Sequence, residues 1–334
     1  MPRLSIVIPY LSSPDRLEQT LESVLANRPR RCEVVVVLAR AYDDPYHLGD
    51  EVRYVSARSC AGLAESINLG IRECRAPIVH LLACGATVDE GWTAGPLEDL
   101  RDRRLGSVAP LVLDERDPTQ IVSAGMEYHP GGVRRLLGRG LPAARAAELA
   151  TSILGPTAQA AFYRRGAALA NEGLFDVSLG DGLADADLAL RLRQAGNQAR
   201  FEPTSIVYDA PAAATRPSFV AARQAERIFW RHAPTLGLAR SIALHGLVVA
   251  GELRRGLPHP SALTQLAGRM VGSCDWGNHQ RQRHRWALPP AEGGERRSSE
   301  LDEHTATVAS RIDPSHAKVD ASNCRTLGQR SQSV

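Results

Sequence analysis

The sequence has no hydrophobic run long enough to cross a bilayer, no cysteine pair with metal-ligand spacing and no large excess of one charge. The longest apolar stretch, residues 242–250, is far below the roughly 18–20 residues that a membrane-spanning helix needs. The six cysteines are scattered without a CxxC pair, which favours free thiols in a reducing compartment over a zinc site. The 40 basic residues nearly balance the 37 acidic ones, so we do not expect a nucleic-acid binder.

The chain starts with MPRLSIVIPY, in which one arginine precedes a short apolar run that ends at Pro9. A secretory signal needs a longer apolar run followed by small residues, so we expect a strand here and a cytoplasmic protein. Residues 242–250 could still pack on a membrane surface or on a partner helix. Peripheral association with the inner face of a membrane is therefore left open.

The first hundred residues alternate between strand and helix patterns. Segments rich in apolar residues, typical of buried parallel strands, lie at residues 4–8, 33–38, 52–55 and 78–82. Between them, apolar side chains recur at helical spacing, as at Leu17, Leu21 and Val24. This alternation predicts an α/β fold with a mostly parallel sheet flanked by helices. Ligands of such sheets bind at the carboxyl ends of the strands, so the loops after Ile8 and Leu38 and after residue 82 should carry the chemistry.

Composition divides the chain into three parts. We expect residues 1–215 to form the α/β domain and residues 216–286 to form a helical extension, because apolar residues recur there at helical spacing. After Trp286 the chain is rich in Glu, Ser, Arg, Thr and Gln and poor in apolar residues. This composition predicts a disordered tail over residues 287–334.

Seven segments, in order from residue 4 to about residue 210, resemble blocks of the family 2 glycosyltransferases. They read LSIVIPY, EVVVVLARAYDD, CAGLAESINLGI, VHLLACGATVDEGW, AAFYRRGAALANEGLFD, ADADLALRLRQAG and FEPTSIVYD. The piece LALRLRQAG is the most specific. The resemblance implies a GT-A (Rossmann-like) fold. It also implies an inverting transfer of a sugar from a nucleotide-sugar donor to a glycan or lipid-linked acceptor, as in the synthesis of cell-surface polysaccharides.

The resemblance further implies which residues face the nucleotide-sugar donor. They are Pro9, Tyr10, Leu38, Asp43, Gly62, Asn68, Ala83, Gly85, Arg164 and Arg165. At Leu38 the family commonly has an acid that contacts the base, whereas Asp43 keeps the later acidic position of that loop. Arg164 and Arg165 could bind the diphosphate through their guanidinium groups in place of a metal, or could be solvated surface charges.

The loop after the fourth predicted strand is where the family binds Mg²⁺ or Mn²⁺ through the carboxylates of a DxD motif. Here it reads Leu-Ala-Cys-Gly-Ala over residues 82–86 and has no oxygen-bearing side chain. Cys84 is a soft ligand and suits neither ion. Asp89 and Glu90 could reach the loop only if it rearranged. We therefore name no metal ligand, and Mg²⁺ or Mn²⁺ stays open as a cofactor although the DxD carboxylates are absent.

An inverting transferase needs a general base for the proton of the acceptor hydroxyl. The family supplies it from a Glu-Asp pair, in which the Glu is replaced here by Ala184 whereas Asp185 is present. We predict Asp185 as the base, with a helix N-cap or first-turn acid as the alternative. Asp187 and Arg191 are assigned to the acceptor side, although their spacing also predicts an ion pair that fixes one helix. Tyr208 occupies the place of the family's late histidine, which makes it a further acceptor-side candidate.

Two functions from different classes remain open. One is an active glycosyltransferase with a weak or absent metal requirement, which the acceptor block favours. The other is a catalytically inactive protein with the same fold that acts as a binding or scaffold subunit, which the missing DxD carboxylates favour. An unrelated dinucleotide-binding protein is not expected, because no GxGxxG follows the first strand.

Overall fold

The computed structural model describes residues 1–58, 61–170, 174–211, 218–256 and 261–274. All of them belong to one compact unit, Met1–Arg283. The predicted tail, residues 287–334, lies outside the described residues.

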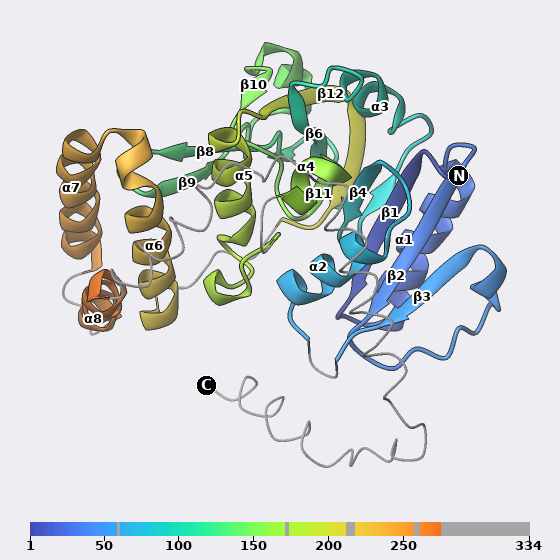
Figure 1. Ribbon diagram of the computed structural model, residues 1–334, viewed down its shortest axis with the longest axis horizontal. Helices are drawn as coiled ribbons and strands as arrows, with labels where there is room; N and C mark the ends of the chain where they lie inside the picture. The colour runs from blue at the N-terminus through green and yellow to red at the C-terminus, as the bar shows by residue number, and fades with distance from the viewer. Residues whose placement is uncertain (59–60, 171–173, 212–217, 257–260, 275–334) are drawn as a thin grey trace, which may run out of the picture. The chain divides into compact units, whose positions relative to one another are not determined.

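A 10-stranded sheet forms the centre of this unit (Figure 1). Its main path runs in the order β10 (Ser152–Ile153), β12 (Gln198–Asp209), β6 (Leu105–Asp114), β11 (Ala160–Arg164), β4 (Ile78–Leu82), β1 (Leu4–Tyr10), β2 (Cys32–Leu38) and β3 (Val52–Ser56). Off this path, β5 (Thr87–Val88) pairs with β12 and β7 (Ile121–Ser123) pairs with β6. A separate hairpin is formed by β8 (Met126–His129) and β9 (Val133–Leu136).

The direction of the strands decides where a ligand can bind. Strands β3, β2, β1 and β4 are mutually parallel, and β12 is parallel to β6. Strand β11 lies between β4 and β6 and is antiparallel to both. The carboxyl ends of β1, β2, β4, β6 and β12 therefore share one edge of the sheet, which we call the carboxyl edge. The predicted mostly parallel α/β sheet is confirmed.

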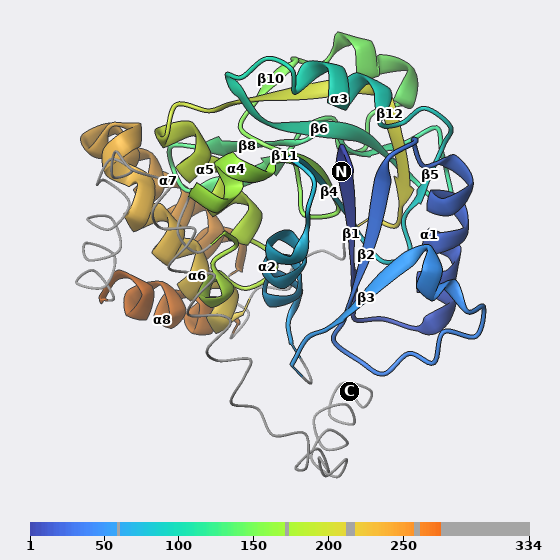
Figure 2. The same ribbon diagram turned by 45° about the vertical axis from the view of Figure 1, so that its right-hand side comes forward.

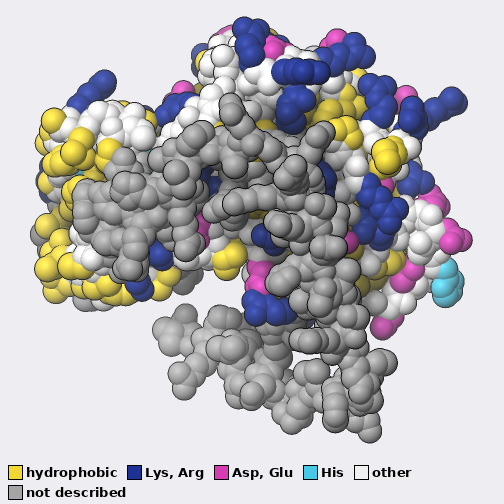
Figure 3. Space-filling model, viewed as in Figure 1, with side chains coloured by type: hydrophobic (Ala, Val, Ile, Leu, Met, Phe, Trp, Pro, Cys, Tyr) yellow, Lys and Arg dark blue, Asp and Glu magenta, His cyan; other side chains and the backbone are white. Residues whose placement is uncertain are grey.

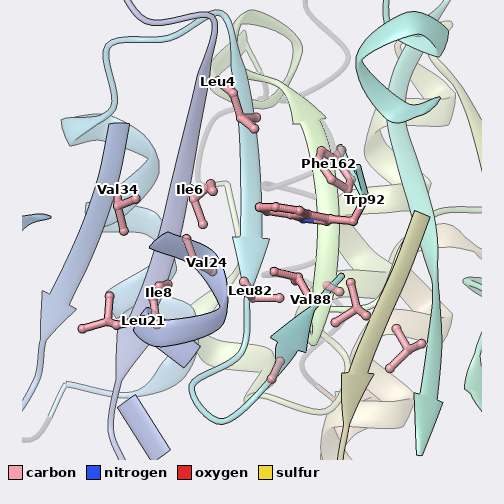
Figure 4. Packing of buried hydrophobic residues seen from close by; sticks show 14 of the residues in the cluster. Leu4, Ile6, Ile8, Leu21, Val24, Val34, Leu82, Val88, Trp92 and Phe162 are labelled. Carbon is pink, nitrogen blue, oxygen red and sulfur yellow. The ribbon is translucent and has the colours of Figure 1, made fainter. Parts of the chain in front are cut away.

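Helices cover both faces of the sheet (Figure 2). On one face, α1 (Pro14–Asn27) packs Leu17, Leu21 and Val24 into a core that also contains Trp92, just before α3 (Ala94–Asp99) (Figure 4). On the other face, α2 (Leu63–Glu73) lies against β1 and β2. A side chain at Gly70 would begin 2.4 Å from Cγ1 of Val7, so glycine permits this close approach.

Two further helices lie between β11 and β12 in the chain, and three follow β12. The chain forms α4 (Arg165–Ala170), α5 (Ala184–Gln194), α6 (Phe219–His232), α7 (Leu238–Gly256) and α8 (Ser261–Cys274). Short 3₁₀ helices occur at η1 (Leu48–Asp50), η2 (Ala143–Glu148), η3 (Val177–Leu179) and η4 (Ala233–Leu236). Buried Glu226 of α6 accepts hydrogen bonds from His245 of α7 and Arg269 of α8, both at 2.8 Å. One carboxylate thus links the three last helices.

Several large hydrophobic side chains are exposed on α7 and α8. Leu247 is 71% exposed, Leu263 is 65% exposed and Met270 is 64% exposed. Figure 3 shows hydrophobic side chains gathered over this part of the molecule. None of the helices among the described residues is long and apolar enough to cross a membrane.

Candidate functional site

The structure brings the predicted donor loops after β1 and β2 together at the carboxyl edge. The register pairs Pro9 with Val37 and Tyr10 with Leu38, so both strands end side by side. The ring of Tyr10 is buried and lies edge-on to the ring of Tyr42, 5.7 Å away between centroids. The ring of Tyr42 in turn lies 5.8 Å, between centroids, from the ring of Tyr54 in the middle of β3. An aromatic cluster of three tyrosines therefore lies next to Leu38.

The other loops of the predicted donor side have different environments. Asp43 is exposed in the loop after β2. Gly62 is the N-cap of α2, in extended backbone conformation. Asn68 is 5% exposed, and its side-chain amide exchanges two hydrogen bonds with the backbone of Phe175, at 2.8 and 2.9 Å. Asn68 therefore fixes the chain before η3 from the interior, whereas Asp43 and Gly62 remain near the edge.

The loop after β4 is held from three sides. The N–H of Ala83 donates to the carbonyl of Gln159 at 2.8 Å, and the hydroxyl of Ser12 donates to Sγ of Cys84 at 3.2 Å. The N–H of Gly85 donates to Oγ1 of Thr20, on α1, at 2.7 Å. Gly85 has a φ of 107°, which strongly favours glycine. The loop that should hold the metal is thus fixed in one shape by hydroxyl and carbonyl groups.

A guanidinium group lies directly over this loop. A side chain at Gly85 would begin 2.2 Å from Nε of Arg16, so the absence of a side chain there makes room for the guanidinium. Nη1 of Arg16 donates to Oε2 of Glu115 at 2.8 Å, and Nη2 lies 3.6 Å from Oδ1 of Asp209. We call Arg16, Glu115 and Asp209 the Arg16 cluster. It joins the first turn of α1, the segment after β6 and the end of β12 at the carboxyl edge.

Asp209 is the most perturbed carboxylate of this cluster. Burial raises the pKa of Asp209 to about 6, against the opposing effects of hydrogen bonds from Gln159 and the backbone N–H of Ala210 and of the charge on Arg16. The amide of Gln159 donates to Oδ2 of Asp209 at 2.8 Å. The charge of the Arg16 cluster therefore changes close to neutral pH.

Tyr208, predicted at the late position of the site, faces elsewhere. Successive residues of a strand point to opposite faces, so Tyr208 and Asp209 cannot both enter the cluster. The hydroxyl of Tyr208 donates to Oδ2 of Asp89 at 2.7 Å. Asp209, not Tyr208, is the residue of this strand end that reaches the Arg16 cluster. Asp89 is therefore hydrogen-bonded to Tyr208 and does not belong to the Arg16 cluster.

The residues around Gly85 do not fit a divalent cation. A hard cation needs several oxygen ligands, and Mg²⁺ needs nearly octahedral geometry. The two carboxylates at this place, Glu115 and Asp209, both contact the guanidinium of Arg16. Across the described ranges, no group of three or more His, Cys, Asp or Glu side chains could hold a metal ion.

Asp185, the predicted base, lies in the first turn of α5 and is 2% exposed. Its Oδ2 accepts hydrogen bonds from Nη2 of Arg134 at 2.5 Å and from the N–H of Ala158 at 3.2 Å. Ala158 precedes Gln159, which contacts Asp209. Asp185 and Asp209 therefore flank the same short segment before β11. Asp185 is not the N-cap of α5, since that position is Leu183.

Asp187 and Arg191 lie in the interior, at 0% and 2% exposure. Nε of Arg191 donates to Oδ2 of Asp187 at 2.8 Å, and Arg231 and His232 of α6 donate to Oδ1, each at 2.8 Å. Burial alone would raise the pKa of Asp187, but the charges of Arg191 and Arg231 hold it below its usual range. The predicted ion pair is present, and the partners of Asp187 are side chains of α5 and α6. The acceptor-side role of Asp187 and Arg191 stays a prediction.

Arg164 and Arg165 also need correction. The register pairs Ala160 with Leu82 and Arg164 with Ile78, so antiparallel β11 carries both arginines to the opposite edge of the sheet. There Arg164 donates to the carbonyls of Leu100, Asp102 and Leu105, and Arg165 donates to those of Ile71 and Arg72. They fix backbone segments and lie far from the loop after β4. The predicted contact with the diphosphate is wrong for this structure.

Arg16 and Glu115 were not predicted from the sequence. Arg16 lies in the first turn of a helix and Glu115 in a turn, and neither belongs to a recognisable motif. They are 99 residues apart in the sequence and meet because α1 packs beside the end of the sheet. The one signal in the sequence that could have indicated Arg16 was its position, because α1 begins directly after the loop that follows β1.

Comparisons with known proteins concern the fold. No protein-family model matches the chain, and a sequence search of curated proteins finds no match. A crystal structure of GalNAc-T7 with UDP, GalNAc and Mn²⁺ matches with a TM-score of 0.54 at 15% identity. The match covers 86% of this chain and 59% of that chain, so this chain spans less than two thirds of it.

The mannosyltransferase PcManGT from Pyrobaculum calidifontis, in complex with GDP-Man and Mn²⁺, matches over 92% of this chain and 80% of that chain at 16% identity. Its TM-score of 0.46 is too low to carry an argument. Identities this low show a shared fold and do not establish function. Membership of family 2 stays a prediction. Strand order, strand direction and the match to GalNAc-T7 together show that the chain has the GT-A glycosyltransferase fold.

Proposed function

We propose that this protein is a glycosyltransferase that binds a nucleotide sugar at the carboxyl edge. It transfers the sugar to a glycan or lipid-linked acceptor in the synthesis of cell-surface polysaccharides. The observation that carries the proposal is the Arg16 cluster, which three segments assemble beside the loop after β4, at the edge where parallel α/β sheets bind ligands. The structural neighbour GalNAc-T7 was solved with UDP and GalNAc, which supports a nucleotide-sugar donor.

The nucleoside half of the donor belongs beside the ends of β1 and β2. Pro9, Tyr10 and Leu38 form an apolar floor there, and Tyr42 adds an aromatic ring within 5.7 Å of Tyr10. A planar base gains free energy from stacking on such rings. Exposed Asp43 offers a carboxylate to base or ribose hydrogen-bond donors.

The reaction needs a base on the far side of the sugar from the diphosphate. The acceptor oxygen forms a bond to the anomeric carbon while the bond from that carbon to the diphosphate oxygen breaks. The electron pair of the broken bond leaves with the nucleoside diphosphate, and the acceptor proton passes to the carboxylate of Asp185. Asp185 accepts a hydrogen bond from the N–H of Ala158, and Asp209 of the Arg16 cluster accepts one from the side chain of Gln159, so the two carboxylates contact neighbouring residues of the segment before β11.

A non-catalytic binding role is the second candidate. The contacts of Asp185 favour it, because the Oδ2 oxygen of Asp185 already accepts hydrogen bonds from Arg134 and from the N–H of Ala158. Binding of a nucleotide sugar without turnover would then be the whole activity of the site.

We further propose a cytoplasmic location with peripheral association at the inner face of the membrane. Cys32, Cys74 and Cys84 are free thiols, as expected in a reducing compartment. The exposed hydrophobic side chains of α7 and α8 would contact the membrane surface.

The test is an assay of donor cleavage. The purified chain is incubated with a panel of UDP-, GDP- and dTDP-sugars, with and without a lipid extract as the source of acceptor, and the released nucleoside diphosphate is measured. The proposal expects release from one nucleotide class and loss of most of it in Asp185→Asn. Binding of a nucleotide sugar without any release would favour the second candidate, and no binding at all would refute both.

A further inference from the structure

The Arg16 cluster occupies the place where the fold's metal loop meets the carboxyl edge. We infer that the guanidinium of Arg16 is the cation that binds the donor diphosphate in this protein, in place of a divalent metal. The inference rests on the proposed function, because it needs a nucleotide donor at this edge. It assigns to one side chain of α1 the charge that neutralises the leaving group.

The shape of the loop supports this role. Gly85 has no side chain at the point where Cβ would lie 2.2 Å from Nε and 2.4 Å from Cζ of Arg16. Oγ1 of Thr20 accepts the N–H of Gly85 at 2.7 Å and donates to the carbonyl of Arg16 at 3.1 Å. The same helix therefore fixes both the guanidinium and the loop beneath it. The loop after β4 thus leaves room for the guanidinium of Arg16 at Gly85.

The charges around Arg16 leave it able to bind phosphate. The guanidinium has five N–H donors, of which Nη1 donates to Glu115 at 2.8 Å. Asp209 is 3.6 Å from Nη2, which is beyond hydrogen-bond distance. The side chain of Arg16 is 33% exposed, so the group is reachable from solvent. A guanidinium is always charged and matches the geometry of phosphate oxygens, which makes it suited to this substitution.

A metal at this place would compete with Arg16 for the same partners. Glu115 and Asp209 would be its ligands, and both are already in ion pairs with the guanidinium. The loop adds no side-chain oxygen ligand, because Cys84 has a sulfur atom and Gly85 has no side chain. Binding of the diphosphate should therefore need Arg16 and should not need a divalent cation.

The experiment is calorimetric titration of the full 334-residue chain in EDTA with UDP, GDP and dTDP. The variants are Arg16→Gln, Arg16→Lys and Glu115→Gln. The matched control is Arg101→Gln, which removes a guanidinium from an exposed ion pair with Glu98. Thermal unfolding of each variant is measured alongside the titration. The nucleoside of the diphosphate that binds is titrated as well, because it lacks the phosphates that Arg16 would contact.

We expect one nucleoside diphosphate to bind the wild type in EDTA. Arg16→Gln should weaken its binding about 10- to 100-fold, the size of a hydrogen bond to a charged group. Arg16→Lys should lose less, because it keeps the charge but not the planar fork. Glu115→Gln should bind at least as tightly as the wild type, because it removes a carboxylate that competes for Arg16. The affinity for the nucleoside should be the same in all variants.

Two results would overturn the inference while the proposed function stands. The first is equal affinity of Arg16→Gln and wild type for the diphosphate in EDTA. The second is diphosphate binding that requires Mn²⁺ or that is lost in Glu115→Gln, since that carboxylate would then be a metal ligand. No binding of any nucleotide by the wild type would refute the proposed function and the inference with it.

Discussion

Replacing Asp187 by alanine should destabilise the protein strongly, because this carboxylate lies at the centre of a buried charge cluster. Asp187 is fully buried and accepts hydrogen bonds from Arg191, Arg231 and His232, each at 2.8 Å. Two of these donors belong to α6, so the cluster also joins α6 to α5. The nitrogen Nδ1 of His232 lies 2.8 Å from the amide of Gln194, which leaves Nε2 as the donor to Asp187.

The expected loss follows from what the substitution leaves behind. Arg191 and Arg231 are 2% and 1% exposed, so both guanidinium groups would stay buried without the shared carboxylate. Breaking a buried ion pair by removing one partner costs about 3–5 kcal/mol. Arg231 keeps a second partner, Asp176 at 2.8 Å, so one guanidinium remains compensated. We therefore expect a loss of about 3–5 kcal/mol in the free energy of unfolding and no larger value.

Urea unfolding followed by circular dichroism and tryptophan fluorescence measures this loss, and coincident transitions from both probes would support a two-state analysis. Glu98→Gln is the matched control, because it removes a carboxylate from the exposed pair with Arg101 and should change stability little. A loss below about 1 kcal/mol in Asp187→Ala would refute the reasoning, since such a value is typical of an exposed ion pair.

The remaining predictions concern pH, the base, metal and the loop. Burial lowers the pKa of His80 from 6.5 to about 3, so the unfolded chain takes up this proton first. The contribution of His80 to the free energy of unfolding should thus be complete above pH 6.5 and fall by up to about 1.4 kcal/mol per pH unit as the pH drops toward 3. In urea denaturation, the free energy of unfolding of His80→Leu should depend less steeply on pH over this range. Asp185→Asn should lower turnover by roughly 10²-fold or more in the donor-cleavage assay, and unchanged turnover would remove Asp185 from the mechanism. EDTA should leave most turnover intact, and a complete loss restored by Mn²⁺ would contradict the account. Gly85→Ala should weaken diphosphate binding, because the added Cβ meets the guanidinium of Arg16 and the positive φ of Gly85 strains an alanine in the loop; unchanged titration curves would contradict this.

The parallel part of the fold could be predicted because its signals are local. Residues 4–8, 33–38, 52–55 and 78–82 are rich in apolar side chains, and each segment lies within an observed strand. Burial on both faces requires such runs, so the sequence carries the information directly. The helical face of Leu17, Leu21 and Val24 is equally local, and all three side chains are buried.

The direction of β11 could not be predicted, and this caused the error at Arg164 and Arg165. A short apolar strand looks the same in sequence whether it runs parallel or antiparallel to its neighbours. Because β11 is antiparallel, its start and not its end lies at the carboxyl edge. Gln159 therefore reaches Asp209, while the two arginines fix backbone carbonyls at the opposite edge.

The charged clusters depend on contacts between distant segments, which no local pattern contains. The spacing of Asp187 and Arg191 predicts their ion pair but not its burial, which comes from Arg231 and His232 of α6. In the same way, Arg16 meets Glu115 only because α1 packs beside the end of the sheet. The sequence shows that the loop after β4 lacks DxD carboxylates, and the structure places the guanidinium of Arg16 over that loop.

The most direct test of the account is a crystal structure of the chain with its nucleoside diphosphate, grown in EDTA. The account predicts the two phosphates within hydrogen-bond distance of the guanidinium of Arg16, above Gly85, with the base beside Tyr10 and Leu38. A diphosphate bound at the opposite edge, near Arg164 and Arg165, or bound through a metal held by Glu115 and Asp209, would contradict it.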